Sequence, residues 1–159
     1  MSRENVEVVL ALFDAWNRGD MDAPFREAGY GIDSGRTPPV SELEKFSDVL
    51  ALIDPEVEVE ATPGGLLGGA TYHGHEGLLK LIVDFWGQFD ERRSEVKECI
   101  PAGGDQVITT VLHHARGKES RVEVEMWQHH LWTLRGGRVV RWQLFLTREE
   151  ALEAEGLQE

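Results

Sequence analysis

The second half of the chain constrains the fold most, because it contains four long alternating segments separated by glycine turns. These segments span residues 94–100, 106–115, 121–135 and 138–147. Alternation of apolar and polar residues over such lengths is typical of strands with one buried face. Short turns between consecutive strands predict antiparallel pairing.

Helical spacing of apolar residues marks most of the remaining chain, in segments at residues 2–18, 41–54, 75–89 and 148–155. The apolar stripe of the first segment consists of Val6, Val9, Leu10, Phe13 and Trp16. One further strand is predicted at residues 56–61. Helices followed by a run of strands predict an α+β fold, in which three N-terminal helices pack on a strongly curved antiparallel sheet that encloses a pocket.

The length of 159 residues predicts a single domain over residues 1–159. Its least regular segment, residues 21–40, is punctuated by glycine and proline and predicts an inserted loop. Two interpretations of this loop stay open: a lid over the pocket, or a disordered insertion.

Charge and composition exclude several classes of function. Sixteen Lys and Arg against 29 Asp and Glu give a net charge of −13, which argues against nucleic acid and anionic membranes as partners. Acidic Glu4 and Glu7 argue against a signal peptide, and no apolar run is long enough to span a membrane. The single cysteine, Cys99, cannot form an internal disulfide, so a cytoplasmic location is expected.

The last hairpin decides which side chains face the pocket, and it has two interpretations. A two-residue turn at Gly136-Gly137 pairs Arg135 with Arg138, whereas a three-residue turn places His130 opposite Trp142. The three-residue turn joins the two more apolar faces, so we expect it. The inner wall is then Met126, Gln128, His130, Trp132, Val140, Trp142, Leu144 and Leu146.

The outer face of the same hairpin carries Trp127, His129 and Leu131. This face is more apolar than a solvated sheet surface, which predicts that a second copy of the chain covers it in a homodimer.

Several segments together resemble the nuclear transport factor 2-like superfamily and, within it, the SnoaL-like domains related to polyketide cyclases and ketosteroid isomerases. The matching segments are AWNRGD at 15–20, LIDPEV at 52–57, YHGHEG at 72–77, HLWTLRGGRVV at 130–140 and REEALE at 148–153. The resemblance implies a cone-shaped α+β fold with a deep pocket, and commonly a dimer. It implies no single reaction, because this fold carries enzymes and non-catalytic binders alike.

The resemblance also suggests roles for single residues. His130 falls where the isomerases place an oxyanion-stabilising acid and where the cyclases favour histidine. Glu60 falls on or next to the isomerases' general base. The isomerases' oxyanion tyrosine falls on Leu12 and the cyclases' acid/base aspartate on Leu144, so both of those groups are missing here.

Each candidate residue has an alternative interpretation. His130 acts as acid, base or oxyanion donor, or it is a hydrogen-bonded core histidine. Glu60 acts as a base if it faces the pocket, but Val57 and Val59 compete for the buried side of that strand. The pairs His113-His114 and His129-His130 cannot chelate a metal with both rings, since adjacent strand residues point to opposite faces.

Two functions therefore remain. The first is a cofactor-independent isomerase, cyclase or lyase without a metal, which moves a proton on a small apolar carbonyl-bearing molecule through His130 and Glu60. The second is a non-catalytic binding or scaffold protein of the same fold. In either case the substrate-binding residues are Trp16, Trp86, Met126, Gln128, Trp132, Trp142 and Leu144.

Overall fold

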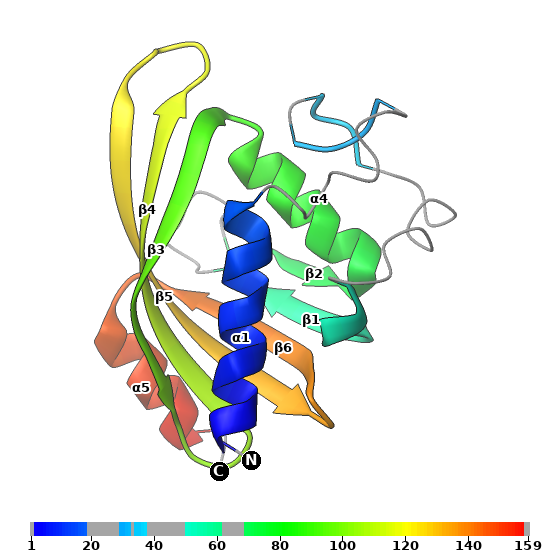
Figure 1. Ribbon diagram of the computed structural model, residues 1–159, viewed down its shortest axis with the longest axis vertical. Helices are drawn as coiled ribbons and strands as arrows, with labels where there is room; N and C mark the ends of the chain where they lie inside the picture. Colours follow the sequence, from blue (N-terminus) through cyan, green and yellow to red (C-terminus); the bar gives the residue numbers. More distant parts are fainter. Residues whose placement is uncertain (1, 19–28, 33, 38–49, 62–68, 158–159) are drawn as a thin grey trace.

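The computed structural model describes residues 2–18, 29–32, 34–37, 50–61 and 69–157 (Figure 1). The expected second helix falls largely on residues 38–49, outside the described residues, apart from a 3-10 turn η1 at Leu50–Leu52. Most of the expected lid at 21–40 also lies outside them. A small turn within it is described, closed by a bridge between Gly31 and Arg36.

Six strands within the described residues form one sheet in the order β2-β1-β6-β5-β4-β3. Their bounds are β1 Ile53–Glu60, β2 Thr71–His73, β3 Phe89–Pro101, β4 Gln106–Gly117, β5 Glu123–Arg135 and β6 Arg138–Phe145. The four long C-terminal strands are antiparallel neighbours, as their alternation predicts. The expectation of a fully antiparallel sheet is wrong, because β1 runs parallel to β6 and the sheet is mixed.

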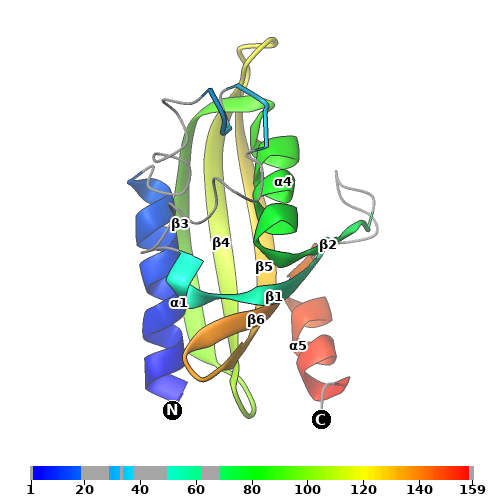
Figure 2. The same cartoon turned by 90° about the vertical axis from the view of Figure 1, so that its right-hand side faces the viewer.

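The α-helices of the described chain are α1 Ser2–Asn17, α4 Gly74–Trp86 and α5 Arg148–Leu157. Figure 2 shows α1 and α5 on opposite sides of the sheet. Helix α4 packs mainly on β1 and β2, and α5 packs on β4, β5 and β6. None of these helices is long and apolar enough to cross a membrane.

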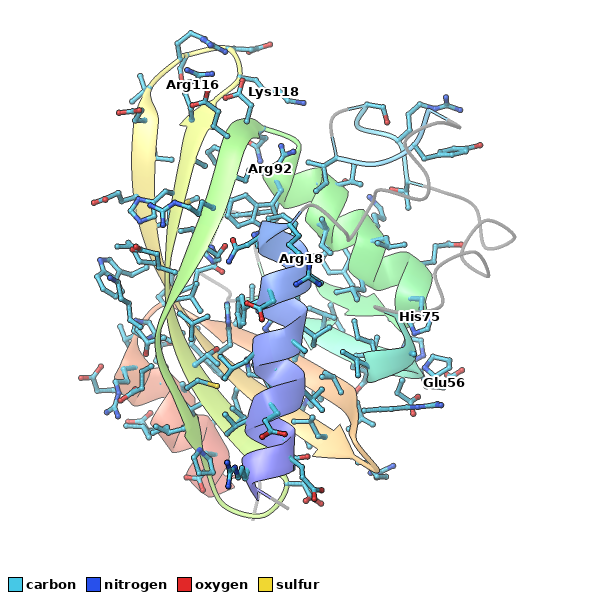
Figure 3. All side chains as sticks on the ribbon, viewed as in Figure 1. Arg18, Glu56, His75, Arg92, Arg116 and Lys118 are labelled. Atoms are coloured by element: carbon cyan, nitrogen blue, oxygen red, sulfur yellow. The ribbon has the colours of Figure 1, made fainter. Side chains whose placement is uncertain are left out.

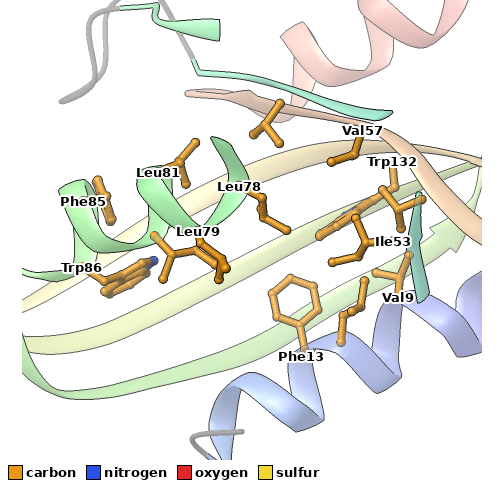
Figure 4. Packing of buried hydrophobic residues seen from close by; sticks show 14 of the residues in the cluster. Val9, Phe13, Ile53, Val57, Leu78, Leu79, Leu81, Phe85, Trp86 and Trp132 are labelled. Carbon is orange, nitrogen blue, oxygen red and sulfur yellow. The ribbon is translucent and has the colours of Figure 1, made fainter. Parts of the chain in front are cut away.

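The core lies between the sheet and the helices α1 and α4. Figure 4 shows Phe13 of α1, Leu78 of α4 and Trp132 of β5 converging there. The stripe predicted for α1 needs one correction. Leu12 is buried, while Leu10 is 38% exposed, because the buried face is centred on residues 9, 12, 13 and 16.

The β5–β6 hairpin has most of the predicted inner face, but its turn and its strand register differ from the prediction. Arg135 pairs with Arg138 across a two-residue turn, in which Gly136 and Gly137 both have positive φ. The register then shifts between Thr133 and Leu134, so β6 carries one unpaired residue, Val140. The expected three-residue turn is therefore wrong, and His130 lies opposite Leu144 rather than Trp142.

The bulge at Val140 changes which β6 side chains are buried. Val139 is buried and lines the interior, whereas Val140 is only half-buried. Leu146, expected on the inner wall, lies beyond the end of β6 and is exposed.

The outer face of the hairpin is partly covered by the chain itself. Leu131 is 0% exposed, on the sheet face against which α5 packs, so no second copy is needed to bury it. Trp127 is 54% exposed.

Candidate functional site

A cavity lies in the core, and water-sized molecules can occupy about 80 Å³ of it. This is room for several water molecules or one small ring, since a single water needs roughly 10–15 Å³. The wall residues that are apolar or tryptophan are Leu12, Phe13, Trp16, Ile53, Val57, Val59, Leu78, Ile82, Trp86, Trp132, Val139 and Trp142. The remaining wall residues are Ser94, His113, Gln128 and His130.

Most of the predicted site residues lie on this wall. His130, Trp16, Trp86, Gln128, Trp132 and Trp142 all line the cavity. Met126 and Leu144 do not. They are half-buried and pack against the core cluster beside it, although their strands place them on the same sheet face.

Glu60 does not face the cavity, which corrects its expected placement. Val57 and Val59 of β1 fill the buried side, so the alternation of the strand turns Glu60 to the other face. There its carboxylate accepts a hydrogen bond from Arg141 Nε at 2.7 Å and forms an ion pair with Arg141 Nη2. The structure therefore does not bring Glu60 to His130.

The polar residues of the wall form one continuous hydrogen-bonded chain. Trp16 Nε1 donates to Ser94 Oγ at 2.9 Å, and Ser94 Oγ lies 2.7 Å from His113 Nδ1. His113 Nε2 lies 2.9 Å from Gln128 Oε1. Ser94 is held in place because its backbone N–H and C=O both bond to the side chain of Asn17, at the end of α1.

The second half of this hydrogen-bonded chain has the same order of groups (indole, hydroxyl, imidazole, amide oxygen) and starts at Trp132. Trp132 Nε1 donates to Thr109 Oγ1 at 2.9 Å, and Thr109 Oγ1 lies 3.1 Å from His130 Nδ1. His130 Nε2 lies 3.0 Å from the same oxygen, Gln128 Oε1. Two imidazoles thus meet at one amide oxygen.

The donors and acceptors of this chain assign both histidine tautomers. A carbonyl oxygen can only accept, so both Nε2 atoms carry protons and donate to Gln128. Both Nδ1 atoms then accept from the hydroxyls of Ser94 and Thr109, which in turn accept from the two indoles. In this arrangement every indole, hydroxyl and imidazole hydrogen of the hydrogen-bonded chain has an acceptor, and only the amide hydrogens of Gln128 have none within the described residues.

Both imidazoles are neutral at pH 7. Burial lowers the pKa of His113 to about 4, and the effect of burial outweighs its hydrogen bond to Gln128. Burial, with smaller contributions from His113 and His129, lowers the pKa of His130 well below its ordinary value. With neutral histidines, the wall carries no charged side chain among the described residues.

One buried polar atom of the wall has no hydrogen-bond partner among the described residues. Trp142 Nε1 is buried and forms no hydrogen bond within the described chain. The indole stacks on Trp132, with ring centroids 4.8 Å apart, and lies nearly perpendicular to the His130 ring, with centroids 5.3 Å apart. A buried N–H without an acceptor is costly, which makes this indole a candidate donor to a ligand.

The other histidines lie outside the cavity wall. His75 Nε2 bonds to the carbonyl of Ile53 at 2.8 Å. His73 Nε2 lies 3.1 Å from Glu56 Oε2, near the start of α4. Figure 3 labels Glu56 and His75 in this region. No group of three metal-ligating side chains occurs among the described residues. Burial raises the pKa of the Cys99 thiol to about 11, so this cysteine is no ready nucleophile.

Sequence reasoning missed Ser94, Thr109 and His113 as parts of the site. His113 alternates on β4 with the inward residues Val111 and Ala115, which is a signal that could have placed it on the inner face. Ser94 carries no such signal, because its role depends on the distant contact with α1.

This α+β arrangement of a six-stranded sheet and helices around an apolar cavity is the fold of solved nuclear transport factor 2-like proteins. The SnoaL-like domain family matches residues 43–142, and the chain belongs to this family. No curated protein sequence matches the chain.

Solved structures of low sequence identity share the fold. TerC, co-crystallised with polyporic acid, is 19% identical with a TM-score of 0.64, over 96% of this chain and 98% of TerC. A nuclear transport factor 2-like protein of unknown function from Burkholderia pseudomallei is 19% identical with a TM-score of 0.64, over 94% and 95% of the two chains. A protein assigned to the SnoaL-like polyketide cyclases from Jannaschia sp. CCS1 is 18% identical with a TM-score of 0.63, over 97% and 92%.

Proposed function

We propose that this protein binds a small, neutral, mostly apolar molecule in the core cavity. The observation that carries this proposal is the composition of the wall, which combines twelve apolar or tryptophan residues with four uncharged polar ones. A charged ligand would lose its hydration without gaining an opposite charge. A neutral ligand gains apolar contact, and four tryptophan side chains supply flat surfaces.

Binding is favoured over proton transfer because of how His130 is held. Its two ring nitrogens are within hydrogen-bond distance of Thr109 Oγ1 and Gln128 Oε1, and burial keeps the ring neutral. The expected base, Glu60, is paired with Arg141 on the other face of the sheet. His130 is therefore better suited to orient Gln128 than to deliver its own proton.

Proton transfer remains the second candidate, supported by the position of His130 on the cavity wall. Under this alternative His130 acts as the acid or oxyanion donor, and the substrate is a small apolar carbonyl compound. Any ligand found by binding is then assayed for turnover with His130→Ala. A loss of turnover well above tenfold in a variant that still binds ligand favours the enzyme.

The binding proposal is tested with one-ring probes of different charge. We expect methylenecyclohexane and cyclohexanone to change the tryptophan fluorescence saturably, and cyclohexanecarboxylate and cyclohexylammonium to have no such effect. Ile82→Phe fills the cavity and should abolish the response. Leu81→Phe is the matched control, because Leu81 is equally buried on α4 but does not line the cavity. Equal binding of the charged probes, or a response unchanged by Ile82→Phe, contradicts the proposal.

We also propose that a second copy of the chain packs on the outer sheet face around Trp127 and His129. The support is the exposure of Trp127, which is unusual for a tryptophan on a regular strand. Leu131 is already buried within one chain, so it offers no surface to a second copy.

A further inference from the structure

The unmet hydrogen-bonding capacity on the cavity wall consists of donors. The amide nitrogen of Gln128 makes no hydrogen bond within the described chain, and Trp142 Nε1 is buried without a partner. The acceptors are occupied, since Gln128 Oε1 accepts from two imidazoles and each imidazole Nδ1 accepts from a hydroxyl. A ligand can therefore complete this wall by supplying an acceptor.

The orientation of the Gln128 amide is fixed by its surroundings. A glutamine amide can usually turn over and exchange its oxygen and nitrogen. Here that exchange would force both His113 and His130 to move their protons to Nδ1. The hydroxyls of Ser94 and Thr109 would then accept two hydrogen bonds each, and their own hydrogens would lose the acceptors they now have. Leaving such buried donors unpaired costs more than a typical hydrogen bond gains.

We infer that Gln128 determines the specificity of the cavity, and that the preferred ligand carries an acceptor oxygen such as that of a ketone, aldehyde or ester. The two histidines act as positioning residues, because they hold the amide with its N–H groups available. This inference rests on the proposed binding function and narrows its ligand class.

The test compares two probes of the same shape, cyclohexanone and methylenecyclohexane, which differ in C=O against C=CH₂. The measured quantity is the ratio of their association constants, obtained from tryptophan fluorescence titrations. Gln128→Glu keeps an oxygen for both imidazole N–H groups and removes the free donor, so it is preferred to Gln128→Leu. Gln106→Leu is the control, because Gln106 is also buried on this sheet but bonds to Thr133 away from the cavity.

We expect the ketone-to-alkene ratio to fall about fivefold or more in Gln128→Glu and to stay unchanged in Gln106→Leu, as the loss of one hydrogen bond requires. In addition, ¹⁵N NMR of the wild type should show both His113 and His130 protonated at Nε2.

If both probes bind and the ratio is the same in Gln128→Glu, the role of Gln128 is wrong while the binding function stands. If either imidazole is protonated at Nδ1, the amide is not fixed as inferred. If neither probe binds to the wild type, the proposed function fails and this inference fails with it.

Discussion

His113 is a buried histidine whose folded-state pKa lies near 4, against 6.5 for the free side chain. Between these pH values the unfolded chain binds a proton that the folded chain excludes, so stability is lost as pH falls from about 6.5 to about 4. The shift corresponds to about 3 kcal/mol of unfolding free energy. His130, with its pKa lowered as well, acts in the same direction.

This pH dependence is measured by urea unfolding at pH 7.5, 6.5, 5.5 and 4.5. We expect the unfolding free energy of the wild type to change little between pH 7.5 and 6.5 and to decline at pH 5.5 and 4.5, and to decline less steeply in His113→Gln. The exposed His73 provides the control variant His73→Gln, which should follow the wild type. Hydrogen bonds from His114, Arg93 and Lys97 lower the pKa of Glu95 to about 2. Protonation of this carboxylate therefore lowers the unfolding free energy further only below about pH 4.5. A flat wild-type profile above pH 5 would contradict the neutral, buried state of both histidines.

Thr109 shows how much of the site depends on one hydroxyl. It accepts from Trp132 Nε1 and donates to His130 Nδ1, and it is fully buried. Thr109→Val keeps the shape but leaves two buried groups unpaired, at a cost of about 2–4 kcal/mol. Thr110→Val is the matched change on the outer face, where the partner His129 is half-buried and water can replace the hydroxyl. We expect the second cost to be about 1 kcal/mol or less, and similar losses in the two variants would disprove the special role of Thr109.

At the scale of the elements, the β5–β6 hairpin explains what sequence can and cannot predict. Alternation along β5 placed Gln128, His130 and Trp132 on one face, and the structure confirms this. The register could not be predicted, because the unpaired Val140 on β6 restores the inner face after a two-residue turn. A single bulge and a turn that is one residue longer both bring the same set of β6 side chains to the inner face. The alternation pattern alone therefore cannot distinguish them.

The strand β1 illustrates a second limit. Val57 and Val59 competed with Glu58 and Glu60 for the buried side, and the apolar pair occupies it. Resemblance to relatives favoured Glu60 in the pocket, but burial of valine decides the strand's orientation. The hydroxyls that complete the site come from Ser94 on β3 and Thr109 on β4, and only the paired sheet brings them to the histidines.

The turn of the β5–β6 hairpin gives a prediction about Gly137. Its φ is +79°, and a Cβ added there would meet no atom within 4 Å, so a substitution tests backbone strain alone. Gly137→Ala should lower the unfolding free energy by about 1–2 kcal/mol, the cost of the left-handed conformation for an ordinary residue. Gly137→Asn should cost less, because asparagine tolerates this conformation. Chemical unfolding of the two variants decides this, and an equal or larger loss for asparagine would argue against the turn geometry.

For the whole molecule, the arrangement of helices decides which surfaces are left for a partner. Helices α1 and α4 close the cavity side of the sheet, and α5 covers part of the other side, including Leu131. The described outer face therefore keeps Trp127 as its large exposed aromatic residue, next to Leu112 on β4. This makes the proposed dimer depend on Trp127 more than on either of its neighbours His129 and Leu131.

The dimer is tested by sedimentation velocity at micromolar concentration. We expect the wild type to sediment as a dimer and Trp127→Lys as a monomer, because a lysine ammonium loses its hydration when it is buried against a second copy. Leu10→Lys is the control, since Leu10 is a large exposed apolar residue on α1, on the opposite side of the sheet. Because the cavity lies on the α1 and α4 side, the monomeric variant should still bind methylenecyclohexane with unchanged affinity. A monomeric wild type removes the dimer proposal, whereas a monomeric variant that loses its ligand shows that the second copy supports the cavity through the sheet.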